Sequence, residues 1–98
     1  MARHYTEKGG EVVETNWRGR AGEVDLIARH GDLTIFVEVK TSRTLAQATD
    51  LLRPAQLARI ARAAEEYMGG ALTDFRIDAG FVDASGAITL YENVTAYS

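Results

Sequence analysis

Two acidic residues and a lysine, Asp25, Glu38 and Lys40, stand in segments that are otherwise rich in apolar and β-branched residues. Carboxylate oxygens are preferred ligands of Mg²⁺. A nearby lysine can stabilise charge on a phosphate, or orient and help to deprotonate an attacking water. These residue types are suited to metal-dependent hydrolysis of phosphate esters, provided that the chain brings them together.

The segments that carry them are predicted to form a β-hairpin. Residues 23–30 and 33–41 read as strands joined at Gly31-Asp32, which is a strong hairpin signal. A turn of two or four residues places Asp25 opposite Glu38 and Glu23 opposite Lys40, whereas an odd-length turn would break this register. Large apolar residues on both faces predict that the hairpin is central and covered on both sides.

Facing carboxylates predict a cation site. Side chains directly opposite each other in a sheet have Cβ atoms about 5 Å apart, and like charges so placed are destabilising unless a proton or cation lies between them. Mg²⁺ or Mn²⁺ at Asp25 and Glu38 would resolve the conflict. The alternative is a solvated strand face on which Glu23 and Lys40 form an ordinary ion pair. The apolar neighbours of Glu38 favour the metal site.

Several other residues could have either a functional or a purely structural role. Arg18, Arg20 and Arg43 could hold the phosphates of a bound strand, or could only improve solubility. Gln56 could contribute to the site, or could only complete the first turn of a helix. Trp17 could stack on a base, although packing is the commoner role of a lone Trp at a strand end.

Two further polar positions are assigned structural roles. Asp78 lies in an apolar strand, where we expect it to partner Arg76 or a backbone amide instead of a metal. Arg59 and Arg62 are expected on the exposed face of a helix, paired with the glutamates that follow them.

Hydrophobic periodicity and turn residues predict an α/β fold with a mixed central sheet of about five strands flanked by helices. The expected order is a short first helix over 2–8, strands over 11–17, 23–30 and 33–41, a helix over 54–68, and strands over 75–83 and 87–94.

Composition limits the function classes. The 98 residues predict a single domain, 1–98, and the absence of cysteine excludes disulfides, zinc fingers and thiol catalysis. With only His4 and His30, a histidine-rich metal site is not expected. A net charge of −3 argues against a surface that is basic throughout, but not against a local basic rim. No apolar run reaches membrane-spanning length, so a cytoplasmic protein without a membrane partner is expected.

Three motifs resemble a known family. They are Asn16-Trp17-Arg18, Gly22-Glu23-Val24-Asp25-Leu26-Ile27-Ala28 and Phe36-Val37-Glu38-Val39-Lys40. Together they resemble the YraN-like family of uncharacterised bacterial proteins, which is related to the PD-(D/E)XK nuclease superfamily and to archaeal Holliday junction resolvases. The resemblance implies a restriction-endonuclease-like core, with a first helix shorter than is usual in the family.

The resemblance also implies roles for the site residues. It assigns metal binding to Asp25 and Glu38, catalysis to Lys40, and an acidic neighbouring role to Glu23. We therefore expect a Mg²⁺- or Mn²⁺-dependent nuclease acting on DNA, including branched or damaged DNA. The alternatives are a catalytically inactive nucleic-acid-binding module and a dimeric scaffold on the same fold, and a homodimer is left open.

Overall fold

The computed structural model describes residues 1–41, 53–70 and 74–94. Its elements, in chain order, are α1 (Ala2–Glu7), β1 (Glu11–Arg18), β2 (Glu23–His30), β3 (Leu33–Thr41), α3 (Pro54–Met68), β4 (Phe75–Val82) and β5 (Ile88–Tyr91). The five strands form one sheet in the order β1-β2-β3-β4-β5. Only β3 and β4 are parallel, so the sheet is mixed. The predicted α/β fold, with a restriction-endonuclease-like core, is confirmed.

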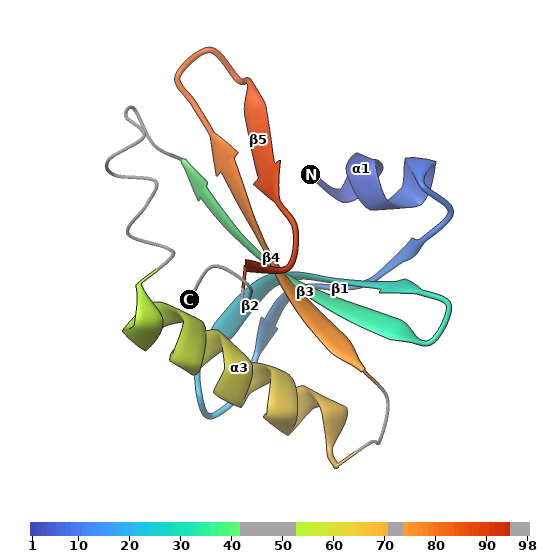
Figure 1. The fold of residues 1–98 in the computed structure, drawn as a ribbon, viewed down its shortest axis with the longest axis vertical. Coiled ribbons are helices and arrows are strands. Elements are labelled where there is room, and N and C mark those ends of the chain that lie inside the picture. Colours follow the sequence, from blue (N-terminus) through green and yellow to red (C-terminus); the bar gives the residue numbers. More distant parts are fainter. Residues whose placement is uncertain (42–52, 71–73, 95–98) are drawn as a thin grey trace.

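The sheet is covered on both faces, as the alternating hairpin predicted. Figure 1 shows α1 and α3 on opposite sides of the twisted sheet. Ile27 and Phe36 pack with the apolar stripe of α3, which buries Leu57 and Ile60. On the other face, Tyr5 of α1 packs in a second cluster, whose buried strand residues are Leu26, Ala28, Ile35 and Val37.

The ends of α3 follow from local chemistry. Pro54 occupies the first turn, where its missing N–H costs no helical hydrogen bond. Gly69 ends the helix in the left-handed conformation at φ 60°, which glycine adopts without a steric penalty. The amino end of α3 lies beside the carboxyl end of β3, where Gln56 and Lys40 line one cleft.

Two strands end earlier than predicted, β4 and β5. β4 stops at Val82 because the Asp83 carboxylate accepts hydrogen bonds from the backbone amides of Ser85 and Ala87 and so forms the turn. β5 stops at Tyr91, three residues before the expected end. Asn93 has a φ of 53°, and its amide donates to the Asp78 carboxylate, which takes this segment out of the sheet.

Candidate functional site

An open cleft of about 480 Å³ lies at the carboxyl end of β3. It is lined by Asp25, Glu38, Val39, Lys40, Thr41, Arg53 and Gln56. Three of these are the residues from which the metal site was predicted. Residues from two strands and from the start of α3 therefore converge on one hollow.

The hairpin register is the predicted one along its paired length. Pairing runs from His30 and Leu33 to Leu26 and Val37. Beyond Leu26 the backbone ladder between β2 and β3 ends, and a side chain replaces it. The Asp25 Oδ2 accepts a hydrogen bond of 2.8 Å from the backbone amide of Val39. This bond holds the Asp25 carboxylate against the segment of β3 that carries Glu38 and Lys40.

Glu38 is the most perturbed acid of the cleft. Only 14% of its side chain is exposed, and Oε2 is buried without a hydrogen-bond partner in the described part of the chain. Burial, followed by repulsion from Asp25, raises the pKa of Glu38 from 4.5 to about 7. A buried oxygen without a partner is costly for a fold to keep. It is well placed to accept a proton or to bind a cation.

Arg59 contacts Glu38, and this corrects the sequence interpretation. Arg59 was assigned to an exposed helix face, but 30% of its side chain is exposed and its Nη2 lies 3.5 Å from Glu38 Oε1. Nη1 also donates to the backbone carbonyl of Glu23 at 3.2 Å, and Nε to Gln56 Oε1 at 3.4 Å. Arg59 lies at the edge of the buried stripe, next to Ile60, so its long side chain reaches over the sheet.

The second predicted cross-strand pair does not form. Glu23 was expected opposite Lys40, but it pairs with Arg18 of β1, with Arg18 Nη2 3.5 Å from Glu23 Oε2. Lys40 is exposed and pairs through its backbone with Phe81 of β4. The ladder between β2 and β3 ends at Leu26, before it reaches Glu23, whereas the ladder between β1 and β2 continues to Arg18 and Glu23.

Of the described residues predicted to contact phosphates, Gln56 lines the cleft, whereas Arg18 and Arg20 do not. Arg18 lies beside Glu23. The backbone amide of Arg20 donates to Glu66 at 2.9 Å. Since Glu66 is ten residues along α3 from Gln56, Arg20 lies about 15 Å from the amino end of that helix. Arg43 lies outside the described residues.

Trp17 has the packing role. Its ring meets Tyr67 of α3 edge to face, with the ring centroids 5.4 Å apart. The Glu66 carboxylate, expected to pair with an arginine of its own helix, instead accepts hydrogen bonds from the amides of Arg20 and Ala21. These contacts attach the link between β1 and β2 to α3.

The donor set fits a hard cation. Among residues 1–41, 53–70 and 74–94, no group of three or more His, Asp or Glu side chains is arranged to hold a metal ion. Mg²⁺, however, needs only one or two carboxylates, because it keeps several waters and binds substrate phosphates. Asp25 and Glu38 supply two carboxylates, and Oε2 of Glu38, which has no hydrogen-bond partner within the described residues, is an available ligand atom.

Comparison with known proteins gives the family. The profile of the uncharacterised protein family UPF0102 matches residues 1–82. The chain belongs to this family. A UPF0102 protein of Ruegeria pomeroyi is 44% identical over 97 residues, covering 95% of this chain and 79% of the relative. A UPF0102 protein of Cereibacter sphaeroides is 43% identical over 100 residues, covering 98% and 86%.

Membership of UPF0102 confirms the expected YraN-like family, and the names of these relatives state no activity. The described part of the chain holds no helix that is long and apolar enough to cross a membrane. Sequence reasoning missed Arg53 and Arg59 as residues of this site. Their only signal was helical spacing, because Arg53, Gln56 and Arg59 recur every three residues on one side of the helix start.

Proposed function

We propose that this UPF0102 chain is a metal-dependent nuclease that hydrolyses phosphodiester bonds in DNA. The observation that supports this most directly is that Asp25, hydrogen-bonded to the Val39 amide, lies next to a largely buried Glu38, whose Oε2 has no hydrogen-bond partner among the described residues. Asp25 and Glu38 would hold Mg²⁺ or Mn²⁺. When bound, the cation would supply charge neutralisation at the scissile phosphate and a more acidic water.

The remaining groups of the cleft suit an anionic substrate. Lys40 extends from the exposed end of β3 and can donate hydrogen bonds to a phosphate oxygen. Gln56 and Arg53 stand at the amino end of α3, where the helix dipole favours negative charge. This basic rim beside two carboxylates accounts for how a chain of net charge −3 could still engage DNA.

Arg59 has a positioning role in this proposal. It neutralises Glu38 in the absence of a cation and holds the backbone of Glu23 in place. Cation binding at Glu38 would weaken the ion pair but leave the bond to the Glu23 carbonyl. Glu23 itself contributes an acidic neighbour, with 40% of its side chain exposed.

The catalytic lysine provides the test. We expect Lys40→Ala to reduce Mg²⁺-dependent cleavage of forked, nicked or linear DNA by at least about 100-fold, because a charge-stabilising donor is lost. Circular dichroism and the unfolding midpoint should stay unchanged, since Lys40 is exposed. Arg62→Ala, an exposed cation of α3, is the matched control and should retain activity. Unchanged cleavage by highly purified Lys40→Ala protein would refute the role of Lys40.

A catalytically inactive nucleic-acid-binding module is the second candidate. It is favoured by the ion pair of Arg59 with Glu38, which neutralises the acid without any cation. Gel shifts in EDTA and in Mg²⁺ separate the two candidates. The module would retain forked DNA equally well in both and leave it intact, whereas the nuclease would need Mg²⁺ and would cut it.

A further inference from the structure

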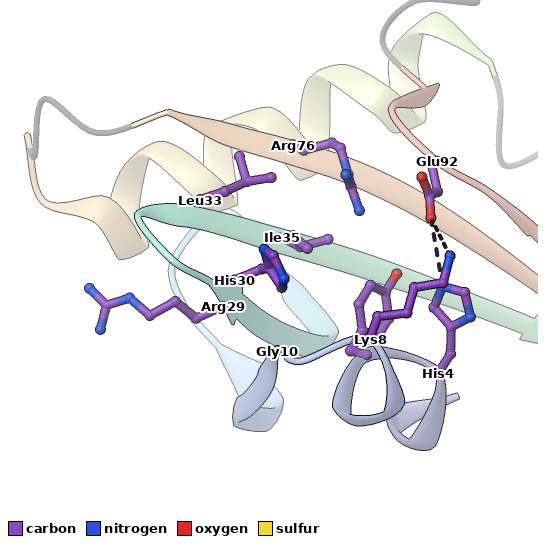
Figure 2. A pocket seen from close by; sticks show the side chains of 10 residues that line it. His4, Lys8, Gly10, Arg29, His30, Leu33, Ile35, Arg76 and Glu92 are labelled. Atoms are coloured by element: carbon purple, nitrogen blue, oxygen red, sulfur yellow. Dashed lines mark ion pairs between the residues drawn. The ribbon is translucent and has the colours of Figure 1, made fainter.

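A second pocket lies beside α1, on the other face of the sheet from α3. It has a volume of about 240 Å³, and Leu33 and Ile35 of β3 are among its lining residues (Figure 2). Leu33 is five residues from Glu38, which is about 17 Å along an extended strand. The pocket is therefore separate from the acidic cleft.

Basic side chains gather around this pocket. Lys8, Arg29 and Arg76 line it together with His4 and His30, and the single carboxylate among the lining residues is Glu92. The chain has a net charge of −3, only two histidines and only two lysines. Both histidines and one of the lysines are at this pocket.

Arg76 is held rigidly at its edge. Its Nε and Nη2 donate to the two oxygens of the fully buried Asp78, at 2.8 and 3.0 Å. A guanidinium carries five N–H groups, so three remain for another acceptor. A cation fixed in advance loses less conformational freedom when it binds an anion.

A buried nitrogen of the pocket lacks a hydrogen bond. His4 Nε2 is buried and without a partner in the described part of the chain. Its nearest acid is Glu92, whose Oε1 lies 3.6 Å away, which is too long for a hydrogen bond. Lys8 Nζ is 3.7 Å from the same oxygen. Glu92 therefore makes only long contacts with His4 and Lys8, and both of these side chains can still donate a shorter hydrogen bond to another acceptor.

We infer that this pocket binds the phosphate group of a small phosphate monoester. Figure 2 shows donors arriving from three directions: Arg76 from β4, His30 from β2, and His4 of α1 with Lys8, which directly follows that helix. A tetrahedral phosphate can accept from all three, whereas a planar carboxylate offers two oxygens. The volume equals that of about eight waters. Besides the phosphate, this leaves room for a small organic group packed against Ile35.

The position of the pocket favours a free small molecule over the terminal phosphate of a DNA strand. A strand bound at Glu38 and Lys40 would have to pass around the sheet to reach the opposite face. The pocket is also smaller than the roughly 300 Å³ at which sites for larger ligands begin. A compact ester fits both observations.

Titration of the ¹⁵N-labelled full chain with phenyl phosphate tests the inference. We expect saturable shifts of the Gly10 and His30 backbone amides at millimolar ligand, since both residues line the pocket. Lys8→Ala should weaken the affinity about tenfold through loss of a charged donor. Glu92→Gln should strengthen it about threefold, because Lys8 and His4 lose their acidic competitor. Arg3→Ala is the matched control on α1, paired with Glu7 away from the pocket, and should change the affinity less than about twofold.

Three outcomes would overturn the inference. The first is an absence of saturable shifts, or equal affinity in the wild type and in Lys8→Ala. The second is equal binding of benzoate, which would mean that the pocket does not select phosphate. The third is binding of a 5′-phosphorylated oligonucleotide, but not of phenyl phosphate or the unphosphorylated oligonucleotide. That last result would assign the pocket to nucleic-acid ends.

Discussion

Glu38 combines burial, a neighbouring carboxylate and an arginine in one place. Its Oε1 faces Arg59, its Oε2 has no partner among the described residues, and the pKa of the group is raised to about 7. In the apo protein around neutral pH, the acid therefore exchanges between two protonation states. A site that must bind a cation and release it can use such a residue.

The raised pKa of Glu38 predicts how stability depends on pH. Between 4.5 and about 7 the folded chain holds a proton that the unfolded chain has released. Its stabilising contribution is thus complete below pH 4.5 and is lost as the pH rises through 7, on the order of 3 kcal/mol. Urea unfolding in metal-free buffer should show this loss in the wild type and not in Glu38→Gln.

Glu65→Gln, an exposed glutamate of α3, is the control and should follow the wild type. If the wild type and Glu38→Gln lost stability in parallel across this range, Glu38 would not be the titrating group.

Gly22 makes room for Arg59, and the two should be energetically coupled. Gly22 has a φ of 143°, and a Cβ added there would lie 2.6 Å from Arg59 Nη1. Gly22→Ala should therefore both strain the backbone and displace Arg59 from Glu23 and Glu38. In an Arg59→Ala background only the strain remains. A double-mutant cycle by urea unfolding should give a coupling of roughly 1 kcal/mol.

Gly69→Ala provides the matched control for that cycle. Gly69 also has a positive φ, but an added Cβ would meet no atom within 4 Å. Its cost should be the same with and without Arg59. Additive costs for Gly22→Ala and Arg59→Ala would mean that Gly22 does not set the position of Arg59.

At the scale of single residues, strand alternation predicted Asp25, Glu38 and Lys40 as neighbours, whereas Gln56 was left with two possible roles, a contributor to the site or a residue that completes the first turn of a helix. Arg59 and Arg53 were not predicted as neighbours of these four. Arg53 lines the cleft from the position just before α3, and Arg59 contacts Glu38 from within α3, so both depend on how that helix docks through Leu57 and Ile60. Helical periodicity identifies a buried stripe, but it does not say where a long side chain at the edge of that stripe will end.

Among the elements, α1, β4 and the segment after β5 meet at one buried carboxylate. Asp78 is fully buried and accepts hydrogen bonds from the Tyr5 hydroxyl, the Arg76 guanidinium and the Asn93 amide. Burial and this hydrogen bond raise the pKa of Tyr5. Both partners that were predicted for Asp78, an arginine and a backbone amide, are therefore present.

Deleting the Tyr5 hydroxyl should weaken the attachment of α1. Tyr5→Phe removes a 2.7 Å bond to a buried carboxylate and should lower the free energy of unfolding by about 1.5–3 kcal/mol. Thr6→Val is the matched deletion, because the exposed Thr6 hydroxyl only donates to a backbone carbonyl in its own helix. Its effect should be below about 0.5 kcal/mol. An equal loss of unfolding free energy in the two variants would show that the hydrogen bond from Tyr5 to Asp78 does not stabilise the attachment of α1.

Most element boundaries were predictable because turn and capping residues are local signals. The boundaries of β2, β3 and α3 agree with the prediction, whereas β5 ended early at a contact between Asn93 and Asp78 that spans 15 residues of sequence. Val24 also departs from strict alternation. It packs on the α3 side with Ile27, in the part of β2 that lies beyond the end of the ladder with β3 and remains paired with β1.

For the whole molecule, charge is distributed between two faces. The α3 side contains an acidic cleft with a basic rim, and the α1 side contains a pocket surrounded by basic residues. The net charge of −3 conceals both features, because a total says nothing about placement. Membership of UPF0102 was recognisable from the motifs, but the basic pocket brings together residues from α1, β2, β3 and β4 and could not be read from sequence order.

Cation binding by Asp25 and Glu38 is the central claim, and calorimetric titration with Mn²⁺ tests it most directly. At about pH 8, above the raised pKa of Glu38, the wild type should show saturable binding. Asp25→Asn combined with Glu38→Gln should weaken that binding at least tenfold, by roughly the effect of losing metal ligands, and Arg62→Ala should not. No binding by the wild type, or binding unaffected by the double substitution, would contradict the account.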